Sequence, residues 1–416
     1  MKKSFALLFA AVLATTAFAA KAPTHHSLRA ESMGNAHVAV VDDKEAIYFN
    51  YAGLNQINRL GNYAKRPEQG YYPRNIFDMR LNVGASGPLE AFFDTYQDAI
   101  DIQNMYKRVD KAAEQTGQPQ RSLLLDTLAS HPELINTLNS YDHRYLTTKV
   151  KMDAELAFHN FGGAIWVDGS MAPYIDGGLV IPYLAIDTFY VDAVMQGGFA
   201  YGFTDELSFG LGLKAAKRQK VEMIVIDIMN YESLNDTLED RISDAEDDIF
   251  DMETISLGLD FGMLWQATRE LRVGASLRDV YFKELSGDKF TPDLTVGLNY
   301  SPRFFNINTA YARKFNIAFD YADAFNSERN YKFFSHINFG LEAEQVLLAW
   351  PGLNNQIRAL MGRLAFGFKG GYPSAGISLE ALHVLTLEFA TWAEEKGYYT
   401  GQDEERTYMG QISIGF

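Results

Sequence analysis

The sequence predicts an all-β transmembrane protein: an antiparallel outer-membrane β-barrel of about 14 strands with an N-terminal plug segment and helical loop insertions. Three observations predict this class. Apolar and polar positions alternate over long runs, an export signal is followed by no apolar stretch of membrane-helix length, and the chain ends on an amphipathic strand. A soluble β-sandwich also alternates, but its strands are usually only about 5 or 6 residues long.

The first 19 residues have the composition of a secretory signal peptide. Two lysines precede an apolar run from Phe5 to Ala14, which is too short to span a membrane. Ala17 and Ala19 supply a small-x-small site, so we expect cleavage after Ala19, with a retained anchor as the alternative. Because the chain has no cysteine, it can carry neither a cysteine-linked lipid anchor nor a disulfide framework. We therefore expect the mature protein in the cell envelope of a Gram-negative bacterium.

Composition narrows the class further. The chain is 47% hydrophobic, yet its mean hydropathy is −0.16, so the apolar residues are dispersed along the chain. Dispersed apolar residues are typical of barrel strands, in which every second side chain is polar or small. The formal net charge of −16 excludes nucleic-acid partners, because phosphates would be repelled.

The alternation is clearest in the second half of the chain. In Leu207–Leu213 every odd position is a large apolar residue and every even position is serine or glycine. The same period of two runs from Ile255 to Trp265 and returns in runs that begin at Leu271, Leu294 and Leu364. Several runs reach the roughly 9 to 11 residues that a membrane strand needs.

Counting such runs predicts an even number of strands, as bacterial barrels require. The predicted strands begin near Ile76, Ala154, Pro173, Ala193, Glu206, Thr254, Leu271, Pro292, Arg313, Tyr331, Ile357, Pro373, His383 and Arg406. The barrel would then occupy residues 76–416, after a plug at 20–75. Short turns at 204–206 and 267–270 fall on the periplasmic side by this count, and the long segments 86–150, 220–253 and 394–405 fall outside.

The last ten residues, TYMGQISIGF, predict a terminal strand with one apolar face. Tyr408, Ile412, Ile414 and Phe416 lie on that face, and Ser413 would point into the lumen. This strand resembles the terminal signal that the outer-membrane barrel-assembly machinery reads. In a closed barrel the last strand pairs with the first, so we expect Phe416 at the membrane rim.

Near the mature N-terminus stands RAESMGNAHVAVVDDKEAIYFNYAGLNQI. It resembles the opening of the FadL/PorV-like outer-membrane barrels, which include long-chain fatty-acid transporters, type IX secretion shuttle proteins and TraF-like envelope proteins. The matching residues are Met33, Gly34, Ala36, Val38 and Ala39, the acidic pair Asp42 and Asp43, and then Ala46, Asn50, Ala52, Gly53 and Leu54. Two positions depart from the family pattern: Asn35 replaces its second glycine, and Tyr51 replaces its proline.

The resemblance implies a passive transporter or binder of hydrophobic compounds, with a plug packed inside the barrel. It implies ligand or plug roles for Met33, Gly34, Asn50, Tyr51 and Ala52. The alternative is a PorV-like accessory protein for secretion or envelope assembly, whose outer loops bind partner proteins. The departure at Tyr51 and the acidic exterior favour this second hypothesis.

Two insertions interrupt the strand pattern. The insertion 86–150 carries two apolar stripes at helical spacing, at 89–109 and 123–138, which either pack on each other as a cap or line an apolar access route. The second hypothesis assigns ligand contact to Phe92, Phe93 and Tyr96. The acidic loop 220–253 lacks the residue order of a calcium-binding loop, so we expect a solvated helical face, with divalent bridging to lipopolysaccharide as the alternative.

No residue pattern indicates catalysis, a cofactor or a metal. The chain lacks a cysteine nucleophile, a Gly-x-Ser-x-Gly elbow, a His-Glu-x-x-His motif and a phosphate loop. His25 and His26 are adjacent, and we expect them to be solvated on a free chain end. The expected partners are outer-membrane lipid, lipopolysaccharide, the barrel-assembly machinery, and either small hydrophobic molecules or secretion-system proteins.

Overall fold

The computed structural model of the chain describes the following residues: 22–57, 77–87, 108–109, 111–119, 122–123, 126, 130, 147–176, 183–186, 189–221, 224–227, 255–283, 291–302, 313–325, 333–351, 356–382, 384–395, 401–402 and 404–415. The predicted signal peptide, the three insertion residues Phe92, Phe93 and Tyr96, and Phe416 lie outside these ranges.

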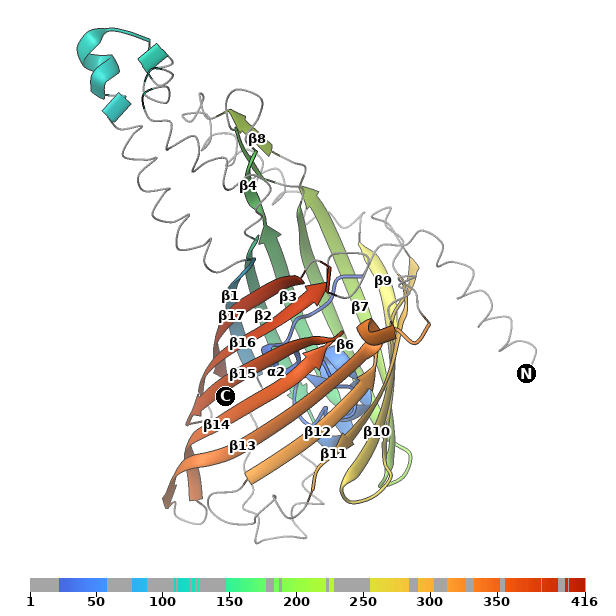
Figure 1. The fold of residues 1–416 in the computed structure, drawn as a ribbon. Helices are drawn as coiled ribbons and strands as arrows, with labels where there is room; N and C mark the ends of the chain where they lie inside the picture. The colour runs from blue at the N-terminus through green and yellow to red at the C-terminus, as the bar shows by residue number, and fades with distance from the viewer. Residues whose placement is uncertain are drawn as a thin grey trace.

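Fourteen strands of the described residues close into one antiparallel barrel (Figure 1), which confirms the predicted fold class. They are β1 (Phe77–Ser86), β2 (Thr147–Phe158), β3 (Phe161–Met171), β6 (Phe189–Gly202), β7 (Leu207–Val221), β9 (Ser256–Gln266), β10 (Leu271–Lys283), β11 (Asp293–Tyr300), β12 (Arg313–Tyr321), β13 (Ile337–Pro351), β14 (Gln356–Lys369), β15 (Tyr372–Ala381), β16 (Leu385–Glu395) and β17 (Glu404–Gly415). The first and last strands close the ring, with Leu81 opposite Ile412. Closure leaves no unpaired strand edge, which a membrane barrel requires.

Each strand has an apolar outer face and a polar inner face. On β17 the side chain of Ile414 is 56% exposed and that of Ser413 only 3%. On β1, Met79 and Val83 point outward and Asn82 inward. Ile412 and Ile414 therefore face out of the barrel and Ser413 faces in, as the alternation predicted.

Two of the predicted strands were placed wrongly, and the errors cancelled in the count. The strand predicted at Pro173 is β4 (Pro173–Asp176), which belongs to a separate three-stranded sheet with β5 (Tyr183–Ile186) and β8 (Ile224–Asp227). The third barrel strand is β3, and the strand before it starts at Thr147 instead of Ala154. The turn between β2 and β3 was missed because its left-handed residue is Asn160 (φ 70°), not a glycine.

Three short connections, two of them predicted from the sequence, share one end of the barrel, although the two-residue turn 370–371 lies at the other end. Connections 159–160, 203–206 and 267–270 lie at the end where β1 begins and β17 ends. The described helical residues 111–116 and the sheet β4–β5–β8 lie beyond the opposite end (Figure 1). Within the insertions, the described residues 111–116 are helical, and residues 224–227 of the acidic loop form β8.

No helix among the described residues is long and apolar enough to cross a membrane.

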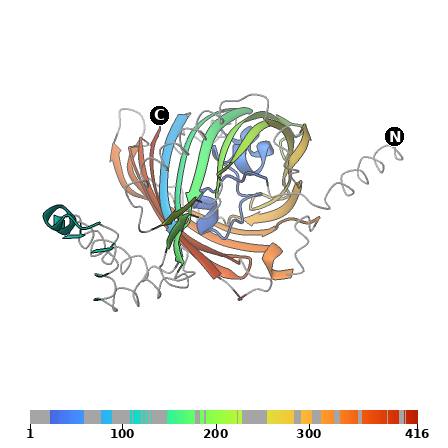
Figure 2. The ribbon, with the colours of Figure 1, turned by 90° about the horizontal axis from the view of Figure 1, so that it is seen from above.

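Residues 22–57, the lumenal segment, lie inside the ring of strands (Figure 2). The segment contains α2 (Leu28–Ser32), α3 (Ala46–Phe49) and the 3-10 helix η2 (Tyr51–Gln56). Side chains cap two of them: Ser27 accepts a hydrogen bond from the backbone N of Ala30, and Asn50 accepts one from Ala52. Nearly all of its residues are buried, so the segment fills the lumen at this level.

Candidate functional site

The candidate site is the contact between the lumenal segment and the inner wall. Where the segment lies closest, the wall carries glycines. A side chain in place of Gly198 would put its Cβ 2.6 Å from Tyr51 Cδ1, and one at Gly212 would overlap the same ring. The tyrosine that replaces the family proline therefore lies on a floor of glycines from β6 and β7.

Asn50 joins two parts of the segment to the wall. Its side-chain nitrogen donates to the carbonyl oxygens of Val38 and Met263, each at 3.0 Å, and its side-chain oxygen accepts from the backbone N of Ala52 at 3.1 Å. All the hydrogen-bonding capacity of this buried amide is thus used except one lone pair. A buried amide with so many partners is costly to replace.

The Met33–Gly34 turn explains the other departure from the family pattern. Gly34 has φ +65°, and a Cβ there would lie 2.6 Å from the Phe339 carbonyl oxygen. The next residue, Asn35, is also left-handed at φ 62°, a conformation that asparagine tolerates better than most residues. Gly34 N donates to Ser374 Oγ at 2.9 Å, which ties the turn to β15.

Arg29 is the main polar anchor of the segment. Its Nε and Nη2 donate to both carboxylate oxygens of Glu342 on β13, at 2.6 and 2.7 Å. Its Nη1 donates to Asp43 and, at 3.3 Å, to Asp42. This pairing gives the acidic pair of the motif a structural role, since both aspartates bind an arginine of the same segment.

Further ion pairs connect the segment to neighbouring strands. Lys44 pairs with Asp78 on β1 and lies 3.7 Å from Glu155 on β2. Lys314 on β12 pairs with Asp42, and Lys369 on β14 donates to Glu31 at 2.8 Å. These charged anchors lie on β1, β2 and β12–β14.

The contacts with β3, β6, β7 and β9 are of another kind. Ile47, Tyr48, Tyr51 and Leu54 form one buried apolar cluster with Trp166, Val194 and Leu264 of the wall. Polar wall residues here bind segment carbonyls: Gln196 donates to Ile47 O at 3.0 Å and Ser208 to Ala52 O at 3.1 Å. We call this cluster the apolar seam.

His25 is buried, contrary to the sequence-based expectation, whereas the side chain of His26 is 31% exposed. The imidazole of His25 is stacked on the Tyr48 ring, with centroids 3.5 Å apart, and the residue is 6% exposed. Burial, and then the neighbouring Lys151 ammonium, hold the pKa of His25 well below its usual value. His26 Nδ1 lies 2.7 Å from Glu31 Oε1. Adjacent histidines give no sequence signal of burial, because the lumen that surrounds them is built by distant strands.

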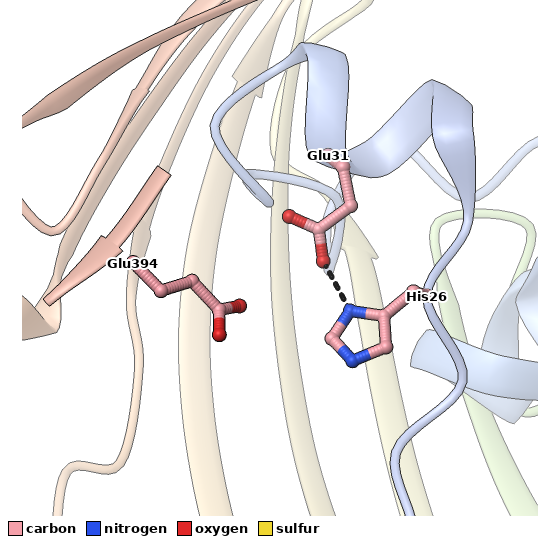
Figure 3. Close-up of side chains that lie close together, drawn as sticks. All are labelled: His26, Glu31 and Glu394. Atoms are coloured by element: carbon pink, nitrogen blue, oxygen red, sulfur yellow. Dashed lines mark hydrogen bonds and ion pairs between the residues drawn. The ribbon is translucent and has the colours of Figure 1, made fainter. Parts of the chain in front are cut away.

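Two groups of the described residues have the donor types of a metal site. One is His26, Glu31 and Glu394 (Figure 3). Lys369 already donates to both of its carboxylates, at 2.8 Å to Glu31 and 2.5 Å to Glu394. The ammonium group therefore supplies the cation that these carboxylates need. The second group, His37, Asp43 and Glu45, has no lysine at its centre among the described contacts.

The lumenal segment brings together five of the predicted site residues: Met33, Gly34, Asn50, Tyr51 and Ala52. Tyr408, Ile412 and Ile414 lie apart from them, on β17. Sequence reasoning missed Arg29, Glu342 and His37. Arg29 and Glu342 are 313 positions apart, and nothing local in the sequence indicates that they pair.

Neither a family model nor a curated protein sequence matches this chain. Similar solved structures include the Ralstonia pickettii toluene transporter TbuX, with 10% identity and a TM-score of 0.45 over 94% of this chain and 98% of that one. They also include the Pseudomonas putida toluene transporter TodX (8% identity, TM-score 0.39, 95% and 97% coverage) and the CymD monoaromatic hydrocarbon channel (10%, 0.40, 95% and 99%). Similarity at this level says nothing about the ligand of this chain. The closed antiparallel barrel of 14 described strands confirms, on the chain's own topology, the fold class that the sequence predicted.

Proposed function

We propose that the protein is a passive outer-membrane channel for small hydrophobic compounds, in which the lumenal segment is the movable closure. The observation that carries this proposal is the apolar seam between the segment and β3, β6, β7 and β9. The inner wall of a membrane barrel is otherwise polar, and an apolar solute gains nothing from a polar surface. The seam supplies a continuous apolar surface inside the lumen.

The contacts of the segment are asymmetric, and this suggests how the closure moves. On β1, β2 and β12–β14 buried ion pairs hold it, and breaking such a pair costs about 3–5 kcal/mol. At the seam, Ile47 and Leu54 lie over Gly162 without any charged contact between them. A hydrophobic solute that enters the seam replaces the apolar contacts between segment and wall by its own apolar contacts with both. The segment therefore leaves the wall first at the seam, and full opening then also breaks the ion pairs of its charged side.

The exterior of the barrel suits the remaining partners in this proposal. The outward apolar face of the strands contacts lipid, and the terminal strand with Tyr408, Ile412, Ile414 and Phe416 is the segment that the assembly machinery recognises. We also propose, from the apolar stripe in the sequence alone, that Phe92, Phe93 and Tyr96 of the insertion contact the solute on its way in. We assign the protein no catalytic role and no cofactor.

A reversible cross-link tests the movable closure. The chain has no cysteine, so Ser32→Cys with Ser374→Cys introduces a single pair. The two serines are adjacent, since Ser374 Oγ donates to Ser32 O at 3.1 Å. Uptake of toluene and of a fatty acid into proteoliposomes is measured under oxidising and reducing conditions. We expect uptake only after reduction, and each single-cysteine variant serves as the redox control.

Two outcomes would contradict the proposal. Equal uptake by the oxidised and reduced double variant means that the segment does not move during transport. Failure of the wild-type protein to transport either compound above empty liposomes removes the transport function itself.

A second candidate is an accessory role in protein secretion or envelope assembly. The sheet β4–β5–β8 favours it, because β4 and β8 are edge strands outside the barrel to which a partner strand could be added. Comparing the secreted and surface proteomes of a gene-deletion strain with those of the parent tests this role. Unchanged proteomes together with impaired hydrocarbon uptake would leave only the transport function.

A further inference from the structure

His37, Asp43 and Glu45 form a compact group within the lumenal segment. One ligand atom of each, a ring nitrogen or a carboxylate oxygen, lies within 4.8 Å of the other two. His37 Nε2 and Glu45 Oε2 are 3.2 Å apart. The histidine belongs to the turn before residue 40, and the two carboxylates lie at the start of α3, so the group joins two parts of the segment.

Three polar atoms of this group are buried without a hydrogen-bond partner. They are both ring nitrogens of His37 and Glu45 Oε2. Although Nε2 and Oε2 are 3.2 Å apart, they do not form a hydrogen bond with each other. His37 is 0% exposed, so water does not compensate for the missing partners. A buried ring nitrogen and a buried carboxylate oxygen that are close together but not hydrogen-bonded indicate that both bind a third group.

The neighbouring groups leave the centre of the site open. Ser27 donates to Glu45 Oε1, and the Arg80 guanidinium also lies on the Oε1 side, at 3.9 Å. Arg29 donates to Asp43 Oδ2. Asp43 Oδ1 accepts from the backbone N of Glu45 at 3.0 Å, so both Asp43 oxygens have a donor, whereas Oε2 of Glu45 has none. The group at His26 differs, because there the Lys369 ammonium contacts both carboxylates directly.

The three side chains of this group are of the types that bind transition metals. A neutral imidazole with two carboxylates is a common donor set for Zn²⁺ and related divalent ions.

We propose that His37, Asp43 and Glu45 bind one divalent transition-metal ion, with Zn²⁺ preferred, and that this ion fixes the turn at His37 to the start of α3. Two ligands at about 2.0–2.1 Å from a tetrahedral zinc are about 3.4 Å apart, close to the observed 3.2 Å. The ion would satisfy Glu45 Oε2 and one nitrogen of His37. The site is independent of transport, because it lies within the segment and not at the apolar seam.

The test is metal content of the folded protein. Wild type is purified in detergent, stripped with EDTA, equilibrated with Zn²⁺, and desalted; zinc per chain is then measured by mass spectrometry. Only material with heat-modifiable gel mobility, and therefore a folded barrel, is counted. We expect one zinc per wild-type chain, and loss of about tenfold or more in affinity for His37→Asn and for Glu45→Gln. His26→Asn is the matched control and should keep its zinc.

Cobalt provides a second readout that does not depend on the variants folding. Co²⁺ added to stripped wild type should produce visible absorption of a tetrahedral site, and Zn²⁺ should abolish it. Absence of stoichiometric zinc and of this absorption in folded wild type overturns the proposal. Full zinc content in His37→Asn, or loss of zinc in His26→Asn alone, overturns it as well.

Discussion

Removing Arg29 tests whether buried ion pairs hold the lumenal segment in place. In Arg29→Met, Glu342 loses two hydrogen bonds of 2.6 and 2.7 Å, and Asp42 and Asp43 lose the same cation. Among the described residues, Glu342 then keeps the Asn316 amide at 2.8 Å, the Arg363 guanidinium at 4.0 Å and the more distant charge of Lys314. Because the Glu342 side chain is fully buried while the segment is seated, its charge becomes uncompensated in the closed state alone.

The magnitude follows from the cost of breaking a buried pair. Removing one partner costs about 3–5 kcal/mol, and every 1.4 kcal/mol is a factor of ten, so the closed-to-open ratio should fall roughly 10²- to 10⁴-fold. Single-channel recording in planar bilayers measures this ratio as the fraction of time spent in the open state. Arg29→Met combined with Glu342→Leu should recover much of the loss, because an apolar pair leaves no unpaired charge.

Arg406→Gln is the matched control, since the exposed pair of Arg406 with Glu404 at 2.6 Å contributes only about 0–1 kcal/mol. If Arg29→Met opens no more often than Arg406→Gln, the ion pairs do not hold the segment. If the double variant opens more than Arg29→Met alone, the uncompensated charge of Glu342 is not the cause.

Three further predictions follow from the same contacts. Ile414→Lys should lower the heat-modifiable fraction of the protein in outer membranes, because a lysine on the lipid face costs about 2–4 kcal/mol at mid-bilayer and less near the rim. Ser413 points inward, so Ser413→Gln should assemble normally. Equal assembly of the two variants would refute the assigned inner and outer faces of β17. Gly212→Ala should raise the open fraction, since its Cβ overlaps the Tyr51 ring, and Tyr51→Ala should reverse the effect; an unchanged open fraction in Gly212→Ala would show that the ring is not confined there. Acid should open the channel. In the closed state the pKa of His25 is lowered by burial and by Lys151 and Arg80, while Asp153 opposes the shift. Below about pH 6.5, His25 therefore takes up a proton when the segment is released but not when it is seated, and the closed state loses up to about 1.4 kcal/mol of stability per pH unit as pH falls. His25→Asn should flatten this pH dependence, and an identical slope in the variant would assign the effect to another group.

The sequence by itself determined the barrel. Period-two alternation is a local property: each residue's outward or inward direction follows from its place along the strand, as at Ile412, Ser413 and Ile414. Repeating that pattern predicts several amphipathic strands, but the predicted count of 14 was reached through two errors that cancelled, and closure depends on the pairing of β1 with β17. The strand predicted at Pro173 was misplaced because a short strand outside the barrel alternates like one inside it. The turn at Asn160 was missed because asparagine stands there instead of the usual glycine.

Only the tertiary structure decided what the inward side chains do. Glu342 looks like any polar residue on the water-facing side of a strand, and its pairing with Arg29 depends on a segment 313 residues away entering the lumen. His25 looks solvated in the sequence, yet the strands around it exclude water and burial lowers its pKa. Facing is fixed by backbone geometry within a few residues, whereas partners, burial and charge state are fixed by which distant residues share the lumen.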